Sequence, residues 1–302
     1  MAPYFYEKIM TYRAFGLNIV SDIPFPTIEP CENERKPDIV IKRVSGMYED
    51  DRETYAAGEA DGSLFYHIAD VGSFRITGGS EILVDAPAAT DDRQVALYLL
   101  GRCMGATFQQ RGWLALHGSC VCHEGKTVLI CGESGAGKST LASEFLKNGW
   151  NLMTDDVALL IQKNGKYHVR SSYPSQKLWK DTISVYDRDN GTLLPLLQES
   201  RRDKYHVKLD QSFFDGELEL SMIAELSVGT GERSFSELKG TAKIAHIIEN
   251  IYLKRILTDE EQNGAAIRSA VLLSQQVKMY SCVRNNDRNC PAYFYQRIEE
   301  NV

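Results

Sequence analysis

A glycine-rich segment between two regular patterns constrains this chain more than any other feature. An apolar, strand-like run at residues 128–131 precedes it, and a helical pattern follows it. The segment reads Gly132, Glu133, Ser134, Gly135, Ala136, Gly137, Lys138, Ser139 and Thr140. Glycines let a backbone adopt unusual dihedral angles and approach an anion closely, and a helix N-terminus presents free N–H groups to that anion. The order strand, loop, helix therefore predicts a phosphate-binding P-loop.

Two side chains of this loop match the chemistry of a nucleoside triphosphate. A lysine at the position of Lys138 supplies positive charge to the β- and γ-phosphates, and a hydroxyl at the position of Ser139 is a ligand for Mg²⁺. We therefore expect ATP and magnesium as cofactors. The loop by itself does not distinguish a kinase from an ATPase, a GTPase or a nucleotide-binding regulatory module that transfers nothing.

Two adjacent carboxylates, Asp155 and Asp156, follow the next strand pattern at residues 150–154. We expect that strand to lie beside the strand that precedes the loop. One carboxylate can hold Mg²⁺, directly or through water, and the other can accept a proton from an attacking hydroxyl. Residues 157–161 and 167–170 then predict a hairpin, because a Lys-Asn-Gly-Lys turn separates them.

A histidine, His117, lies in the apolar run at residues 114–121. Taken alone, a single histidine in such a run is usually a buried core residue. With the loop at 132–139 and the two aspartates, however, it resembles the C-terminal domain of the HPr kinase/phosphorylase family, spacing included. The resemblance implies phosphorylation of a serine hydroxyl, with His117 beside the γ-phosphate. It makes Asp155 the base, and Asp156 with Ser139 the metal ligands, although coupled neighbouring carboxylates can exchange such roles.

The chain also departs from that family. The family's Glu-Ile-Arg-Gly-Leu-Gly signature is absent, and residues 168–179 stand near its place. A family Gly-Arg pair corresponds to Gly240-Thr241, which removes a catalytic arginine. These departures argue against phosphorylase activity and HPr recognition. The cationic candidates for phosphate or substrate contact are Arg201, Arg202, Lys204 and Lys177. A solvated loop and a packed Trp-Lys pair are the alternative interpretations of these positions.

The layout of the whole chain resembles the HPr-kinase-like tailoring kinases of lasso peptide gene clusters. That resemblance implies that the partner is a precursor peptide and that its C-terminal serine is phosphorylated. A different protein serine or a small hydroxyl compound would suit the same site. The resemblance to a hexameric family also makes a homo-oligomer an expectation.

The first ninety residues contain five strand patterns at short intervals, which predict an antiparallel sheet. The patterns cover residues 12–20, 38–44, 64–68, 71–76 and 81–84. A helix is predicted over 91–111, between a capping Thr-Asp pair and Gly112. We therefore predict an α/β P-loop (HPr-kinase-like) domain at residues 91–302, in which 91–111 is the connecting helix. A smaller β-rich α+β domain precedes it at residues 1–90.

The composition limits the kinds of binding partner and the cellular compartment that we expect. The net charge of −7, from 34 basic and 41 acidic residues, argues against a broad nucleic-acid footprint. No apolar run approaches the roughly 20 residues that span a bilayer, so no membrane partner is expected. The N-terminal residues do not resemble a signal peptide. Seven cysteines without metal-ligand spacing are typical of buried, reduced thiols, and the predicted compartment is the cytoplasm.

Overall fold

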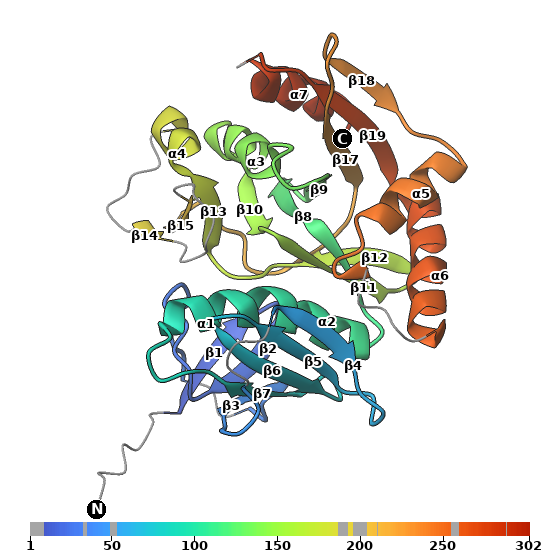
Figure 1. The fold of residues 1–302 in the computed structure, drawn as a ribbon. Coiled ribbons are helices and arrows are strands. Elements are labelled where there is room, and N and C mark those ends of the chain that lie inside the picture. The colour runs from blue at the N-terminus through green and yellow to red at the C-terminus, as the bar shows by residue number, and fades with distance from the viewer. Residues whose placement is uncertain are drawn as a thin grey trace, which may run out of the picture. The chain divides into compact units, whose positions relative to one another are not determined.

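The structure is a computed structural model with mixed α/β character, and it contains two compact units, Met1–Arg111 and Gly112–Val302. It describes residues 9–32, 35–48, 53–186, 193–195, 204–209, 211–254, 260–287 and 289–302. Figure 1 shows the helices and strands of each unit.

The first unit is a seven-stranded sheet in the order β1-β2-β3-β7-β6-β5-β4. Its strands are Met10–Ala14 (β1), Leu17–Ser21 (β2), Ile39–Arg43 (β3), Tyr55–Gly58 (β4), Leu64–Ile68 (β5), Gly72–Thr77 (β6) and Glu81–Asp85 (β7). The prediction of a wholly antiparallel sheet is wrong, because β3 pairs in parallel with both β2 and β7. The connections before and after β3 are long enough to return the chain to the same end of the sheet, which parallel pairing requires.

The single strand predicted over residues 12–20 is a hairpin of β1 and β2. Phe15 and Gly16 lie between the two strands with φ of 54° and 66°. Two successive left-handed residues form the tight turn that matches the twist of paired strands. The alternation of apolar and polar residues therefore continues across the turn. For this reason the alternation alone does not show that the chain reverses direction.

The helix predicted over residues 91–111 is confirmed as a helical segment with a π-helical turn in its middle. It consists of Asp92–Tyr98 (α1), Leu99–Cys103 (η1) and Met104–Gln110 (α2). Asp91 caps its start by accepting a hydrogen bond from the amide of Arg93 at 2.8 Å. The segment covers one face of the first sheet (Figure 1).

This helical segment belongs to the first unit, which moves the predicted boundary from residue 90 to residue 111. The carboxamide of Gln110 accepts from the amide of Gly79 at 2.8 Å and donates to the carbonyl of Ile76 at 2.9 Å. Arg111 donates to the carbonyls of Gly79 and Asp38, each at 2.6 Å. These bonds join the end of α2 to the β6–β7 turn and to Asp38, just before β3, so the helix is fixed to the first sheet.

The second unit is a nine-stranded sheet with helices on both faces, and a smaller sheet of three strands. Its strands are Leu114–His123 (β8), Lys126–Cys131 (β9), Asn151–Thr154 (β10), Val157–Lys163 (β11), Lys166–Arg170 (β12), Ser175–Trp179 (β13), Leu193–Pro195 (β14), Lys204–Lys208 (β15), Glu217–Glu219 (β16), Met222–Val228 (β17), Ser234–Glu237 (β18) and Lys278–Arg284 (β19). Its helices are Lys138–Lys147 (α3), Lys180–Tyr186 (α4), Thr241–Glu249 (α5), Glu260–Gln276 (α6) and Cys290–Glu299 (α7).

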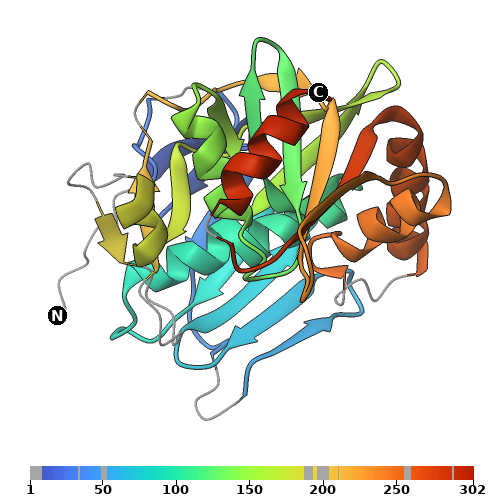
Figure 2. The same cartoon turned by 90° about the horizontal axis from the view of Figure 1, so that it is seen from above.

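Two hydrophobic cores lie on opposite faces of the large sheet. On β9, Val128 and Ile130 pack with α3 and α7, whereas Leu129 and Cys131 pack with α5 and α6. Figure 2 shows α3 and α7 side by side on their face. A strand with both faces covered is a continuous apolar run, which is why β9 is so apolar in sequence.

The large sheet has the order β16-β12-β11-β8-β9-β17-β19-β18, and β10 pairs with β8. The predicted hairpin of β11 and β12 is confirmed, with Asn164 and Gly165 left-handed in its turn. The strand before the two aspartates differs from expectation: β10 does not lie beside β9, because β8 separates them. β8 can pair with both β10 and β11 because it is long, and the two shorter strands share one of its edges.

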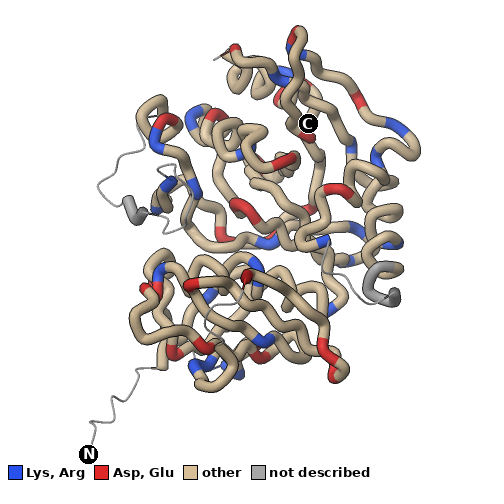
Figure 3. Tube along the Cα trace, viewed as in Figure 1, with Lys and Arg blue, Asp and Glu red and all other residues tan. Residues whose placement is uncertain are grey.

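Acidic and basic residues are interspersed along the described parts of both units (Figure 3). Among the described residues, no helix has the length and apolar character needed to cross a membrane. All seven cysteines are free, and six of them are buried, as the sequence predicts.

The change Gln110→Ala tests the placement of the helix with the first sheet. Without the carboxamide, the amide of Gly79 is left without its partner, so we expect the free energy of unfolding of this unit to fall by about 1–3 kcal/mol. Hydrogen exchange of the β5–β7 amides measures the effect. Gln162→Ala, at an exposed position on β11, is the control. Equal protection of these amides in the two variants would contradict this role of Gln110.

Candidate functional site

The glycine-rich loop runs from the end of β9 to the start of α3, as the motif requires. Gly132, Gly135 and Gly137 have φ of 131°, 84° and 104°, which favour glycine. A Cβ atom at Gly132 would lie 2.1 Å from the carbonyl oxygen of Leu226 on β17. Only glycine therefore lets the loop leave the sheet this close to the neighbouring strand.

Two cations bind the carbonyl oxygens of this loop. Lys138 donates to the carbonyls of Gly132 and Glu133 at 2.7 and 2.9 Å. Arg284, at the end of β19, donates to the carbonyls of Ala136 and Gly135 at 2.6 and 3.1 Å. Lys138 is buried, and this burial lowers the pKa of its ammonium group. The loop is thus held in shape by its own lysine from inside and by an arginine from a distant strand.

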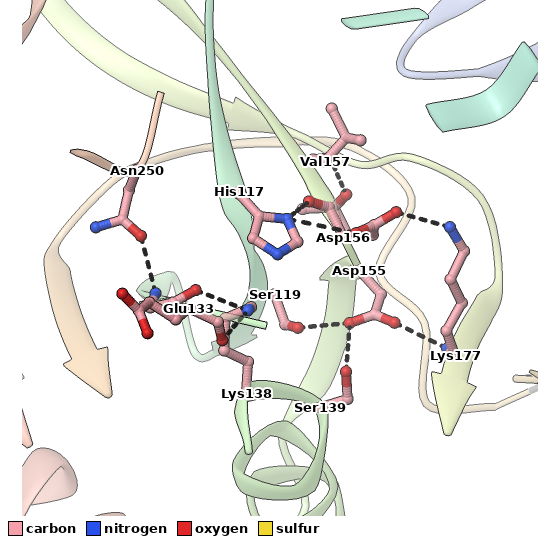
Figure 4. Close-up of polar contacts among 12 residues, drawn as sticks. His117, Ser119, Glu133, Lys138, Ser139, Asp155, Asp156, Val157, Lys177 and Asn250 are labelled. Atoms are coloured by element: carbon pink, nitrogen blue, oxygen red, sulfur yellow. Dashed lines mark hydrogen bonds and ion pairs between the residues drawn. The ribbon is translucent and has the colours of Figure 1, made fainter. Parts of the chain in front are cut away.

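Asp155 is a buried carboxylate, 6% exposed, in the turn between β10 and β11. Its Oδ1 accepts from the hydroxyl of Ser119 at 2.5 Å and from the hydroxyl of Ser139 at 3.3 Å. Its Oδ2 accepts from the backbone amide of Lys177 at 2.8 Å. Donors from β8, α3 and β13 therefore meet on one carboxylate (Figure 4).

Asp156 has a left-handed backbone, with φ of 74°, which aspartate tolerates better than most residues. Its Oδ2 accepts from the ammonium group of Lys177 at 2.7 Å. Burial opposes ionisation, yet the charge of Lys177 holds the pKa of Asp156 well below its usual range. Burial likewise opposes the charge of Lys177, but Asp156 raises the pKa of that lysine above its ordinary value.

His117 lies on β8 beside Asp156. Its Nδ1 is 3.0 Å from the carbonyl oxygen of Asp156 and 3.4 Å from the carboxylate Oδ1. Burial lowers the pKa of His117, which favours the neutral ring near pH 7. A carbonyl can only accept, so Nδ1 carries the proton and Nε2 is an acceptor. The glycine after it is required too, because a Cβ at Gly118 would lie 2.6 Å from the carbonyl oxygen of Ile130.

Most of the site residues predicted from the sequence lie close together. His117, Ser139, Asp155 and Asp156 lie together at one end of the large sheet, with Lys138 at the first position of α3 (Figure 4). The carboxylate beside Ser139 belongs to Asp155, whereas the first expectation paired Ser139 with Asp156. Thr140 lies in the first turn of α3, where its hydroxyl is 3.2 Å from that of Thr182.

Among the cationic candidates, Lys177 contacts both aspartates. Lys204 lies on β15 with its ammonium group 5.2 Å from the ring centroid of Trp179, and its charge contributes to lowering the pKa of Asp156. Arg201 and Arg202 lie outside the described residues.

Sequence reasoning missed several residues that hold the site. They are Ser119, Gln176, Glu225, Asn250 and Arg284. Ser119 follows His117 by two positions on one strand and so faces the same side, a signal available in the sequence. Asn250 and Arg284 lie more than a hundred residues after the loop and had no such signal.

Comparison with known proteins gives two findings. Residues 87–183 match the family model described as SynChlorMet cassette protein ScmC. Among solved structures, the HPr(Ser) kinase/phosphatase from Coxiella burnetii matches with 11% identity and a TM-score of 0.32. That match covers 62% of this chain and 94% of the other. No curated protein matches the chain.

The change Lys177→Met tests the ion pair at the centre of the site. It leaves the carboxylate of Asp156 without its cation, so we expect the free energy of unfolding to fall by about 2–3 kcal/mol. Tryptophan fluorescence in urea reports this unit, because Trp113, Trp150 and Trp179 all lie in it.

Lys126→Met, at an exposed position on β9, is the matched control and should have little effect. The double variant Lys177→Met/Asp156→Asn should be more stable than the sum of the two single changes predicts, since each single change already removes the same pair. Additive losses would mean that the two side chains are not coupled.

Proposed function

We propose that this chain transfers the γ-phosphoryl group of ATP to a serine hydroxyl, with the help of Mg²⁺. One observation carries the proposal: the Ser139 hydroxyl, two carboxylates and a histidine converge beside the glycine-rich loop. Nucleotide binding alone needs the loop and Lys138 but neither the second carboxylate nor the histidine.

The oxygen ligands fit magnesium. The Ser139 hydroxyl and Asp155 Oδ1 are 3.3 Å apart, and adjacent ligands of an octahedral Mg²⁺ at about 2.1 Å are about 3 Å apart. Among the described residues, no group of three His, Cys, Asp or Glu side chains could hold a metal. A magnesium site completed by nucleotide phosphates and water needs no such group. We therefore assign Ser139 and Asp155 to the metal, where the bound ion would neutralise charge on the β- and γ-phosphates.

Asp156 then faces the serine acceptor and takes the role of base. The two aspartates thus exchange the roles first expected of them, as adjacent carboxylates can. In the transfer, the serine oxygen forms a bond to the γ-phosphorus, and the bond between that phosphorus and the β–γ bridging oxygen breaks, so that ADP leaves. The proton of the serine hydroxyl passes to the carboxylate of Asp156. The ammonium group of Lys177 keeps that carboxylate ionised, and Lys177 and His117 together fix its direction. Catalysis rests on positioning and charge, since phosphoryl transfer needs little covalent chemistry from the protein.

We propose the C-terminal serine of a lasso-type precursor peptide as the acceptor. The layout of the chain, with a β-rich unit ahead of the glycine-rich loop, supports this choice through its resemblance to the tailoring kinases. The segment that matches the cassette-protein model, residues 87–183, contains every side chain assigned above. We propose cytoplasmic action as a homo-oligomer, without a nucleic-acid or membrane partner.

Incubation of the full chain with ATP, Mg²⁺ and a peptide ending in serine tests the function. We expect the peptide to gain the mass of one phosphoryl group, and tandem mass spectrometry should place it on the terminal side chain. A peptide with alanine at that position should gain nothing. If no serine-ended precursor peptide is phosphorylated while the chain binds ATP, the assignment as a precursor-peptide kinase is wrong.

The variants Asp155→Asn and Asp156→Asn separate the two carboxylates. Asn at position 155 should raise the Mg²⁺ concentration needed for half-maximal rate by about tenfold or more, because a charged ligand is lost. Asn at position 156 should lower kcat by a factor on the order of 10²–10⁴, leaving ATP binding and the Mg²⁺ requirement near the wild-type values. Titration of the rate with Mg²⁺ measures both effects. The opposite pattern would return the base role to Asp155.

A further inference from the structure

A second polar cluster lies behind the glycine-rich loop, on the face of the sheet that packs with α5. On β17, Met222 and Ala224 face the α3 core, so Glu225 faces α5. Its Oε1 accepts from the Nδ2 of Asn250 at 3.0 Å, and its Oε2 pairs with the Nδ1 of His246. Asn250 caps the end of α5 and is buried, 7% exposed.

Asn250 reaches the start of the loop through its side chain. Its Oδ1 accepts from the amide of Gly132 at 2.9 Å (Figure 4). Its Nδ2 also donates to the carbonyl of His246 at 2.8 Å. The donors and the acceptor of this carboxamide are therefore all engaged, which fixes its orientation. Gly132, which no other residue can replace, is thus bound by the Asn250 side chain, and Glu225 and the carbonyl of His246 hold that side chain in place.

Asn250 reaches the histidine of the site through its main chain. β8 pairs with β9 only as far as Gly118 and Cys131, because the chain then leaves the sheet as the loop. The backbone groups of β8 before that point need other partners. The amide of His117 donates to the carbonyl of Asn250 at 2.8 Å, and the amide of Tyr252 donates to the carbonyl of Ala115 at 2.8 Å.

We propose that Asn250 is a positioning residue that sets the glycine-rich loop and His117 relative to each other. The proposal rests on the nucleotide-binding role proposed above. Glu225 acts through Asn250, since its carboxylate orients the carboxamide. Glu225 interrupts the apolar run of β17, the strand beside β9, where a carboxylate on the α3 face could serve the metal. Here it is turned to the opposite face, and Asp155 stands beside Ser139 instead.

The chain offers a matched control in Asn148, which caps α3. Its Nδ2 donates to the carbonyl of Glu144 at 2.8 Å and to the carboxylate of the same residue at 3.4 Å. Asn148 thus makes the same capping bond as Asn250 but binds no loop amide. Asn250→Ala and Asn148→Ala each remove a side-chain bond to the carbonyl four residues earlier, and only the first also removes the contacts with Gly132 and Glu225.

The test measures the Kd of ATP with Mg²⁺ on the full-length chain, together with kcat and KM for the peptide. We expect Asn250→Ala to weaken ATP binding about threefold to tenfold and to lower kcat, whereas Asn148→Ala leaves both within about twofold. Equal effects of the two changes would overturn the proposal. Failure of the wild-type chain to bind ATP would instead overturn the proposed function.

Two variants that conserve side-chain shape provide a second test if Asn250→Ala does not fold. Asn250→Asp retains the acceptor for Gly132 but places a carboxylate beside Glu225, so we expect weaker ATP binding. Adding Glu225→Gln supplies an amide donor to the new carboxylate and should recover at least half of the lost affinity. A double variant that binds ATP no better than Asn250→Asp would contradict the orienting role of Glu225.

Discussion

The buried carboxylate of Asp155 is the constraint on which the rest of the site depends. A carboxylate this far from water must be surrounded by hydrogen-bond donors, and here each donor comes from a different element. Ser119 brings β8, Ser139 brings the start of α3, and the amide of Lys177 brings β13. Satisfying one charge therefore sets the geometry among three segments that are far apart in the chain.

The same lysine ties the second carboxylate to the first. Lys177 binds Asp155 through its backbone and Asp156 through its ammonium group, so the two neighbouring acids face different partners. Asp155 and Asp156 are the same type of residue, and this arrangement gives their carboxylates different environments. It also places a cation beside Asp156.

The glycine-rich loop is held from both faces of the sheet. On one face, Ser139 and Asp155 meet at the start of α3. On the other, Asn250 accepts a hydrogen bond from the amide of Gly132, and Glu225 holds Asn250 in place. The alternation of side chains along β17 makes this possible, because successive residues point to opposite cores. A loop whose first residue is anchored need not be ordered again when an anion enters it, which lowers the entropic cost of binding.

The local features of the fold could be predicted from the sequence. The glycine-rich loop, the β11–β12 hairpin and the helix over residues 92–110 follow from dihedral preferences and periodicity, which act between near neighbours. Tertiary structure alone decided the parallel pairing of β3, the place of β10 beside β8, the attachment of the helix to the first unit, and the partner of each aspartate. These depend on which distant backbone edges and donors meet. Asn250, 118 residues after Gly132, carries no sign in the sequence that it will bind that amide.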